Sequence, residues 1–208
     1  MDLSNPERVV KLAKYLIMRP RYVPCYIHDN ILGRRSPLEL EKPWWSYSAI
    51  DAMEACINQS SRVFEWGSGG STLFFGQRVG SVDAVESDPT WYALVKQKSE
   101  QYGANKVNLH YRPVERDHLN QFQDSDFLNA LNKPYDVIVI DGIEITGNER
   151  KMCFSHAERH AIEGTIIVVD DFWRYHSLVD NHRAKRVTVY EGTGPGRLGV
   201  TSTAFFFY

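Results

Sequence analysis

A glycine-rich segment follows a short apolar run in the first half of the chain. Residues 63–72 read Val-Phe-Glu-Trp-Gly-Ser-Gly-Gly-Ser-Thr, and a helix-like stretch follows. Glycines at such a place permit a tight turn, and they let a ligand approach bare backbone amides at the positive end of the helix. The next apolar run ends at Glu86, about twenty residues after Glu65, which is the spacing at which an acid reaches ribose hydroxyls in dinucleotide-binding folds. This order of strand, glycine-rich loop, helix, strand and acid predicts a cofactor site. The alternative is an ordinary turn followed by an acid on the surface.

Carboxylates also follow two later apolar runs. Asp141 comes directly after residues 137–140, and Asp170 and Asp171 come directly after residues 166–169. Because ligands of an open α/β sheet bind beyond the carboxyl ends of its strands, we expect these acids at one edge. Three carboxylates there could hold a magnesium ion that orients a deprotonated hydroxyl, which makes Asp141 and Asp171 catalytic candidates. The alternative is that Asp170 or Asp171 caps the next helix and that Asp141 contacts the cofactor.

Histidine is the other residue type that could remove a proton from an acceptor. His176 lies a few residues beyond the pair of acids, so it is the candidate base if no metal is bound. His156 and His160 are four residues apart in a helix-like stretch and share a face, but no third ligand accompanies them. We therefore interpret that pair as exposed or core-edge side chains and not as a metal site.

An aromatic segment precedes the glycine-rich region. It contains Trp44, Trp45, Tyr47 and Ser48. One interpretation is that the segment closes over the cofactor and that these four side chains line the acceptor pocket. The other is that adjacent tryptophans simply pack in the core, as large aromatic side chains commonly do.

The surrounding elements alternate in a way that predicts a parallel sheet. Short β-branched runs alternate with helix-like stretches, which indicates βαβ units with right-handed crossovers. The last two runs are joined by a glycine-rich segment without room for a helix, so they form an antiparallel hairpin. The expected strands are 62–66, 81–86, 107–110, 136–141, 165–170, 187–190 and 201–208. The expected helices are 5–18, 46–58, 71–78, 89–102, 120–131 and 148–162, with an irregular, proline-containing arm over 19–43.

Composition and charge narrow the classes of partner. The 208 residues carry a net charge of −2, so no global basic field favours nucleic acid or an anionic membrane. No apolar stretch reaches the roughly 18 residues that a membrane span needs. The three cysteines show neither zinc spacing nor a disulfide framework, which favours a reducing, cytoplasmic compartment. The aromatic last strand, 204–208, could support a homodimer, although packing inside the monomer explains it equally well.

The motif Glu65-x-Gly-x-Gly-Gly-Ser, followed by Glu86 and by residues 135–142, resembles that of class I S-adenosylmethionine-dependent methyltransferases. The resemblance extends over residues 44–208 and implies a Rossmann-like α/β fold. In that fold a mostly parallel seven-stranded sheet ends in an antiparallel C-terminal hairpin and has helices on both faces. The resemblance also implies cofactor contacts along the strand ends. It places the segment from Arg112 to Glu115 near the adenine. The implied cofactor-binding residues are Glu65, Gly67, Ser68, Gly69, Glu86, Ser87, Glu115 and Asp141.

These observations predict a cytoplasmic enzyme that moves a methyl group from S-adenosylmethionine to a small-molecule acceptor. The acid cluster favours oxygen over nitrogen as the methylated atom, and the absence of a basic field argues against nucleic acid as the acceptor. We expect residues 1–43 to form a cap or substrate wall and residues 44–208 to form the cofactor-binding domain. The alternatives are an aminopropyltransferase-like enzyme and a non-catalytic S-adenosylmethionine-binding protein, because a fold alone does not settle a function.

Overall fold

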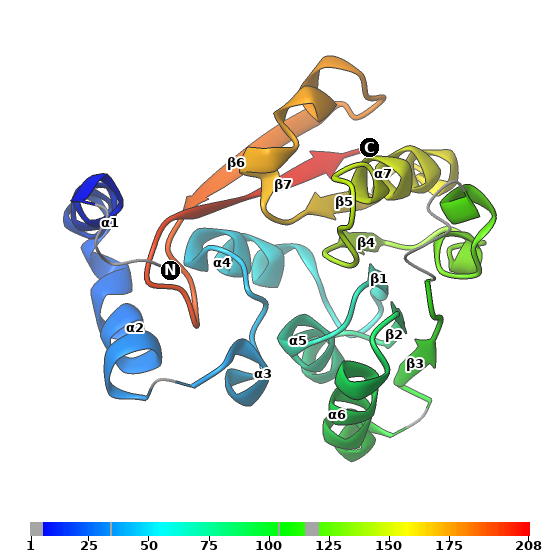
Figure 1. Ribbon diagram of the computed structural model, residues 1–208, viewed down its shortest axis with the longest axis horizontal. Helices are drawn as coiled ribbons and strands as arrows, with labels where there is room; N and C mark the ends of the chain where they lie inside the picture. The colour runs from blue at the N-terminus through cyan, green and yellow to red at the C-terminus, as the bar shows by residue number, and fades with distance from the viewer. Residues whose placement is uncertain (1–5, 34, 104, 115–120) are drawn as a thin grey trace.

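A seven-stranded sheet of order β3-β2-β1-β4-β5-β7-β6 forms the centre of the computed structural model, which describes residues 6–33, 35–103, 105–114 and 121–208 (Figure 1). Neighbouring strands from β3 to β5 are parallel, whereas β7 runs antiparallel to both β5 and β6. The strands are β1 (Arg62–Trp66), β2 (Ser81–Glu86), β3 (Val107–Tyr111), β4 (Val137–Ile140), β5 (Ile166–Val169), β6 (Arg186–Gly192) and β7 (Thr201–Phe207). The predicted Rossmann-like fold with its C-terminal antiparallel hairpin is confirmed.

Helices cover both faces of this sheet, as a continuously apolar strand requires. On one face, Phe64 and Trp66 of β1 pack in a cluster with Phe154 of α7, while on the other face Val63 packs with Phe74 of α5. The α-helices are α1 (Pro6–Met18), α2 (Val23–Tyr26), α3 (Pro37–Leu40), α4 (Tyr47–Cys56), α5 (Gly70–Arg78), α6 (Pro89–Ser99) and α7 (Glu149–His160). None of the helices in the described ranges is both long and apolar enough to cross a membrane.

The N-terminal arm is more regular than its prolines predict. After α1 come η1 (Pro20–Tyr22), α2, the wider turn η2 (Ile27–Leu32) and α3. A proline lies in the first turn of η1, of α2 and of α3, where its missing N–H has no helical partner to lose. The prediction of an irregular arm is therefore wrong, because its prolines begin short helices.

The helix expected over residues 120–131 is not formed by the described part of that range. Residues 121–131 contain 3₁₀ turns instead, among them η5 (Leu128–Ala130). Ser125 Oγ donates to the Phe122 carbonyl oxygen at 2.7 Å and accepts from the Leu128 N–H at 3.1 Å. Asn129 Nδ2 likewise donates to the carbonyl oxygens of Gln123 and Ser125. These side chains bind backbone groups that a helix would use, so they stabilise turns in its place.

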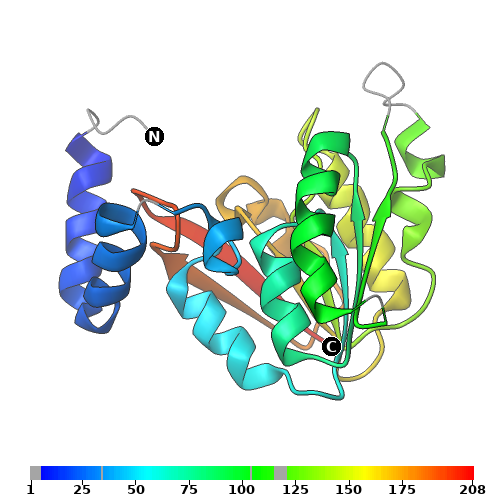
Figure 2. The same ribbon diagram turned by 90° about the horizontal axis from the view of Figure 1, so that it is seen from below.

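Helices α1 and α2 lie at one end of the molecule, opposite β3 (Figure 1, Figure 2). Tyr15 of α1 packs against the end of β6, where it fills the space beside Gly192, and Lys11 forms an ion pair with Glu191. Further along the arm, a side chain at Gly70 would overlap the carbonyl oxygen of Lys42. The arm is thus held close against the sheet end at which the predicted site residues gather.

Candidate functional site

The turn after β1 is one that only glycine can form. Gly67 has a φ of +90°, and a Cβ on it would lie 2.7 Å from the Cα of Gly142, which follows β4. The turn then leads into α5, where Thr72 Oγ1 accepts from the Gly69 N–H at 3.0 Å. The loops after β1 and β4 therefore pack backbone to backbone, and together they form the floor of a pocket.

Glu86 connects this turn to the end of β2. Its carboxylate is only 8% exposed. Oε2 accepts from the N–H of Ser68 at 3.1 Å and from its hydroxyl at 2.9 Å, while Oε1 accepts from the N–H groups of Ser87 and Asp88. The structure therefore places Glu86 against the glycine turn, at the edge of the sheet where the cofactor contact is predicted.

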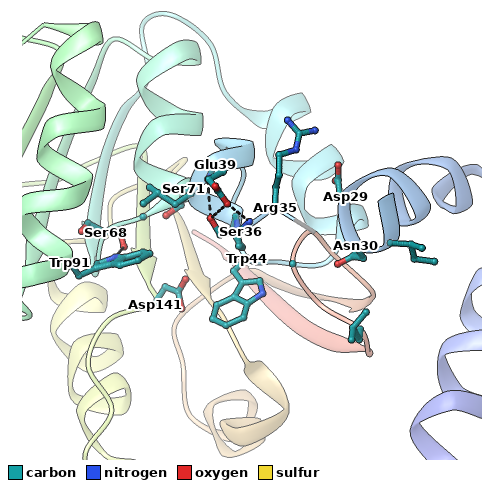
Figure 3. A pocket seen from close by; sticks show the side chains of 17 residues that line it. Asp29, Asn30, Arg35, Ser36, Glu39, Trp44, Ser68, Ser71, Trp91 and Asp141 are labelled. Carbon is teal, nitrogen blue, oxygen red and sulfur yellow. Dashed lines mark hydrogen bonds between the residues drawn. The ribbon is translucent and has the colours of Figure 1, made fainter. Parts of the chain in front are cut away.

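Two adjacent pockets lie beyond the strand ends. The first, which we call the strand-end pocket, has a volume of about 520 Å³ and is lined by residues after β1, β2, β4 and β5. The second, the arm pocket, has a volume of about 850 Å³ and extends from the glycine turn to residues 29–31 and 35–39 of the arm (Figure 3). The two pockets share Trp44, Ser68, Trp91 and Asp141.

Most predicted cofactor residues line one of these pockets. Gly67, Ser68, Glu86, Ser87 and Asp141 line the strand-end pocket, and Gly69 lines the arm pocket. Glu115 lies outside the described residues. The strand-end pocket thus gathers residues that are far apart in the chain, as the Rossmann-like interpretation requires.

Glu65 lines neither pocket. Its side chain is 1% exposed within the core beneath the turn, and burial raises its pKa to about 8. The hydroxyls of Thr72 and Ser71 oppose this shift, but neither comes into ordinary hydrogen-bond geometry with the carboxyl. Glu65 is therefore a buried carboxyl without a hydrogen-bond partner among the described residues, and it lies in the strand that leads into the glycine turn.

The three strand-end acids are paired with arginines. Arg150 of α7 lies 3.4 Å from Asp141, and Arg197 of the β6–β7 loop lies 3.3 Å from Asp170 and 3.2 Å from Asp171. Within the described residues, no group of three His, Cys, Asp or Glu side chains is arranged to hold a metal ion. The predicted magnesium site is therefore not supported, because guanidinium groups already neutralise these carboxylates.

Neither Asp170 nor Asp171 caps the following turn, η6 (Phe172–Arg174), through its side chain. Asp170 accepts from the Thr203 hydroxyl at 2.9 Å, and Asp171 accepts from the Thr201 hydroxyl at 3.0 Å. Burial raises the pKa of Asp170 well above its usual range, Asp141 adds to the shift, and Arg197 opposes it. Both acids therefore attach the strand end to β7 and to the arginine loop.

Asp141 remains the acid best placed for chemistry. Its side chain is 26% exposed and lies where the two pockets meet. Burial raises its pKa, Arg150 opposes this, and the Asp171 carboxylate adds to the shift. A carboxylate with a raised pKa suits a general base, because it holds a transferred proton more readily than an ordinary aspartate.

His176 does not reach either pocket. It is exposed on η7 (His176–Asp180), where its ring packs edge-on against Phe172 at 5.3 Å. The prediction that it acts as the base is therefore wrong, since the chain turns away from the strand end after η6. His156, in turn, is buried and its Nε2 lies 2.8 Å from the Leu131 carbonyl oxygen.

Only one of the four residues expected in the acceptor pocket lines it. Trp44 is 50% exposed and contributes to both pockets, and the guanidinium of Arg197 lies 4.7 Å from its ring centre. Trp45 instead packs fully buried against core aromatic rings, and Ser48 lies 3.2 Å from the hydroxyl of Ser46. Tyr47 is buried behind the arm pocket. The prediction for Trp45, Tyr47 and Ser48 is wrong, because Trp45 and Tyr47 are buried in the core and none of the three lines the arm pocket.

Two arginines of the site have no signal in the sequence. Besides its ion pair, Arg150 donates to the carbonyl oxygens of Gly142, Asp170 and Asp141, which fixes the ends of β4 and β5. Arg197 Nε donates to the Trp44 carbonyl oxygen at 2.9 Å. Neither arginine lies in a motif or at a diagnostic spacing, so only the folded chain brings them to the acids.

Comparison with known proteins identifies the family. A family model described as a methyltransferase domain matches residues 64–172, which is more than half of the chain. A search of curated proteins finds no match. The matched range contains the glycine turn, Glu86, Asp141 and both acids after β5.

Solved structures are similar in fold at low sequence identity. Cofactor-bound Rv0187 from MTB has a TM-score of 0.61 at 18% identity, covering 89% of this chain and 95% of that chain. The O-methyltransferase TomG from Streptomyces achromogenes, involved in tomaymycin synthesis and solved with SAM, has a TM-score of 0.55 at 14% identity over 97% and 99%. An rRNA methylase from Streptococcus thermophilus has a TM-score of 0.56 at 10% identity over 77% and 95%. Together with the family match, the fold and the strand-end motif place this chain in the methyltransferase-domain family, within the class I S-adenosylmethionine-dependent superfamily.

Proposed function

We propose that the chain binds S-adenosylmethionine in the strand-end pocket and methylates a small-molecule acceptor in the arm pocket. The observation that carries this proposal is the junction of the two pockets at Trp44, Ser68, Trp91 and Asp141. Methyl transfer is an in-line displacement, so donor and acceptor must face each other across such a junction. In this proposal the arm, residues 1–43, supplies the acceptor wall, and residues 44–208 supply the cofactor site.

The residues of the strand-end pocket fit this cofactor. Gly67 leaves the pocket floor free of side chains, and Glu86 presents carboxylate oxygens that suit the ribose hydroxyls. Acidic groups, Asp141 among them, line the same pocket and favour a ligand with a positive charge. When bound, the cofactor supplies an electrophilic methyl group on a sulfonium sulfur.

We assign the proton transfer to Asp141. As the acceptor oxygen forms its bond to the methyl carbon and the sulfur–carbon bond breaks, the acceptor hydroxyl loses its proton, and the Asp141 carboxylate takes it up. Asp171 acts as a positioning residue, because it holds Arg197, which in turn stacks on Trp44. A carboxylate at the junction supports oxygen over nitrogen as the methylated atom.

The shape of the arm pocket supports a small molecule as the acceptor. Its lining is mostly apolar, with Leu38, Trp44, Trp91 and Leu198 among the residues. A pocket of this kind and volume suits a drug-sized ligand. Since an rRNA methylase is among the structures of similar fold, RNA is the competing acceptor class.

Isothermal titration tests the cofactor assignment. We expect S-adenosylmethionine and S-adenosylhomocysteine to bind with micromolar affinity, NAD not to bind, and Glu86→Ala to abolish binding of both. Glu163→Ala is the matched control, because Glu163 is 89% exposed and lines neither pocket. Binding of NAD, or full affinity in Glu86→Ala, would refute the assignment.

Transfer of a labelled methyl group tests the acceptor class. Phenols, primary amines and total RNA are incubated separately with the protein and labelled S-adenosylmethionine. Label on a phenol supports the proposal, and label on an amine moves the reaction to nitrogen. If label appears on RNA and on no small molecule, the acceptor is a nucleic acid and the proposed small-molecule acceptor is wrong.

A further inference from the structure

The end of the arm pocket away from the junction contains a buried, unpaired hydrogen-bond acceptor. Asn30 of η2 lines the pocket and is 8% exposed. Its Nδ2 donates to the carbonyl oxygens of Tyr26 and Gly194, each at 3.2 Å, and lies 3.4 Å from the Tyr47 hydroxyl. Its Oδ1 has no hydrogen-bond partner among the described residues. An unpaired buried acceptor is costly, so its presence beside a cavity points to a ligand.

The orientation of this amide follows from its neighbours. Two carbonyl oxygens can be satisfied only by an NH₂ group, so Nδ2 must face Tyr26 and Gly194. Exchanging the nitrogen and oxygen of Asn30 would set its oxygen against both carbonyls. The unpaired atom is therefore the oxygen, and it requires a ligand that donates a hydrogen.

The residues around Asn30 are held by hydrogen bonds, and the negative charge among them is paired with a positive one. Asp29 is buried, and its Oδ2 accepts from the Tyr47 hydroxyl and from Lys42 Nζ, each at 3.0 Å. His28 lies 2.9 Å from the other oxygen of Asp29. Since Lys42 balances Asp29, this end of the pocket favours a neutral donor over an ammonium group. Tyr47, which lines no pocket, thereby positions both Asp29 and Asn30.

Between Asn30 and the junction, the pocket wall is mostly apolar, although Ser36 and Glu39 also line it. Figure 3 shows Asp29 and Asn30 at one side, Ser68 and Trp91 at the other, and Trp44 between them. Leu38 and Leu198 complete the wall. A molecule that fills this space is apolar along its body and polar at two separated points.

We propose that the acceptor is a largely apolar molecule with two separated hydrogen-bond donors. One donor is the hydroxyl that faces Asp141 and is methylated, and the other is a neutral hydroxyl or amide N–H that donates to Asn30 Oδ1. Asn30 thus determines specificity. This proposal rests on the proposed function for the identity of the methylated end, whereas the recognition of a neutral donor by Asn30 is tested by binding alone.

Rigid diols of increasing length are the probes. Hydroquinone, naphthalene-2,6-diol and 4,4′-dihydroxybiphenyl are each titrated beside the analogue that lacks one hydroxyl, with and without S-adenosylhomocysteine. We expect at least one diol to bind about tenfold more tightly than its partner, because the second hydroxyl pairs the buried oxygen. That preference should disappear in Asn30→Leu.

Asn129→Leu is the matched control. Asn129 also donates its amide hydrogens to two backbone carbonyl oxygens, but it is exposed and lies outside the arm pocket. It should retain the diol preference. If Asn30→Leu fails to fold, a crystal structure of the wild-type protein with the preferred diol replaces it, and a hydroxyl within hydrogen-bond distance of Asn30 Oδ1 is expected.

Three results would overturn the inference: no diol preference in the wild-type protein, a preference that survives in Asn30→Leu, or a bound diol whose hydroxyl avoids Asn30. Loss of S-adenosylhomocysteine binding with an intact diol preference would instead contradict the proposed function and leave the recognition by Asn30 standing. The two failures are therefore distinguishable.

Discussion

Replacing Glu65 with glutamine separates a structural role from a ligand-binding role. Glu65 is buried in β1, and burial raises its pKa to about 8 from the ordinary value of 4.5. At neutral pH the native carboxyl is therefore protonated, whereas the same group in the unfolded chain is ionised. Glutamine has nearly the same shape and no charge, so Glu65→Gln removes this difference in proton binding without leaving a cavity.

The size and sign of the effect follow from proton linkage. Between the unfolded and native pKa values the native protein binds more protons, so its free energy of unfolding falls as pH rises from 4.5 to about 8. One bound proton changes that free energy by about 1.4 kcal/mol per pH unit, which sets a ceiling of about 5 kcal/mol. Relaxation around an ionised carboxyl lowers this figure, and we expect about 2–3 kcal/mol.

Urea denaturation of the wild type and Glu65→Gln at about pH 5 and about pH 8 measures the difference. The two proteins should have similar stability at the lower pH, and the variant should be the more stable at the higher pH. Glu163→Gln, at an exposed position, should follow the wild type. If the free energy of unfolding changed with pH in the same way in the wild type and in Glu65→Gln, the claim that the Glu65 carboxyl is buried and protonated would be refuted. Unchanged S-adenosylhomocysteine affinity in Glu65→Gln would agree with its place outside both pockets.

Three further substitutions test the site. Arg197→Met should lower the free energy of unfolding by about 3 kcal/mol near neutral pH, because it leaves the buried Asp170 carboxylate without its cation. In denaturation curves this loss should shrink at acid pH, where Asp170, whose pKa is already raised, takes up a proton. Gly194→Ala should displace the segment that leads into α4, because its side chain would overlap the Trp45 carbonyl oxygen, and calorimetry should show Tm falling by about 5 °C. Asp141→Asn should lower kcat about a hundredfold with the affinity for S-adenosylhomocysteine, which lacks the sulfonium charge, nearly unchanged, and wild-type activity should fall as acid pH protonates Asp141, as kinetic assays across pH would show.

The sheet could be predicted from the sequence because its pattern is local. β4 and β5 are buried on both faces, so they read as continuous apolar runs, and the missing helix between β6 and β7 requires an antiparallel pair. The arm and residues 121–131 could not be predicted in the same way. In the arm, prolines begin helices, and near Ser125 side chains bind the backbone that a helix would use. Both effects depend on individual hydrogen bonds and not on periodicity.

The site was predictable where it follows strand ends and not where it depends on distant segments. Gly67 and Asp141 each follow a strand, Glu86 ends one, and the carboxyl ends of parallel strands meet at one edge. Arg197 and Asn30 reach the pockets from a hairpin loop and from the arm, and no spacing in the chain relates them to the strand ends. Trp44 and Trp45 show the same limit, since neighbours in sequence face opposite environments on entry into α4.

The charges at the strand ends also agree with the proposed cationic cofactor. Arg150 pairs with Asp141, Arg197 is shared by Asp170 and Asp171, and burial favours a proton on Asp170. Asp141, at the junction, is the acid whose ionisation an incoming charge can change. A cationic ligand in the strand-end pocket lowers the pKa of Asp141 and so prepares it to accept a proton, whereas a neutral ligand does not. The same carboxylate can therefore be ionised before methyl transfer and protonated after it, which is the cycle that a general base requires.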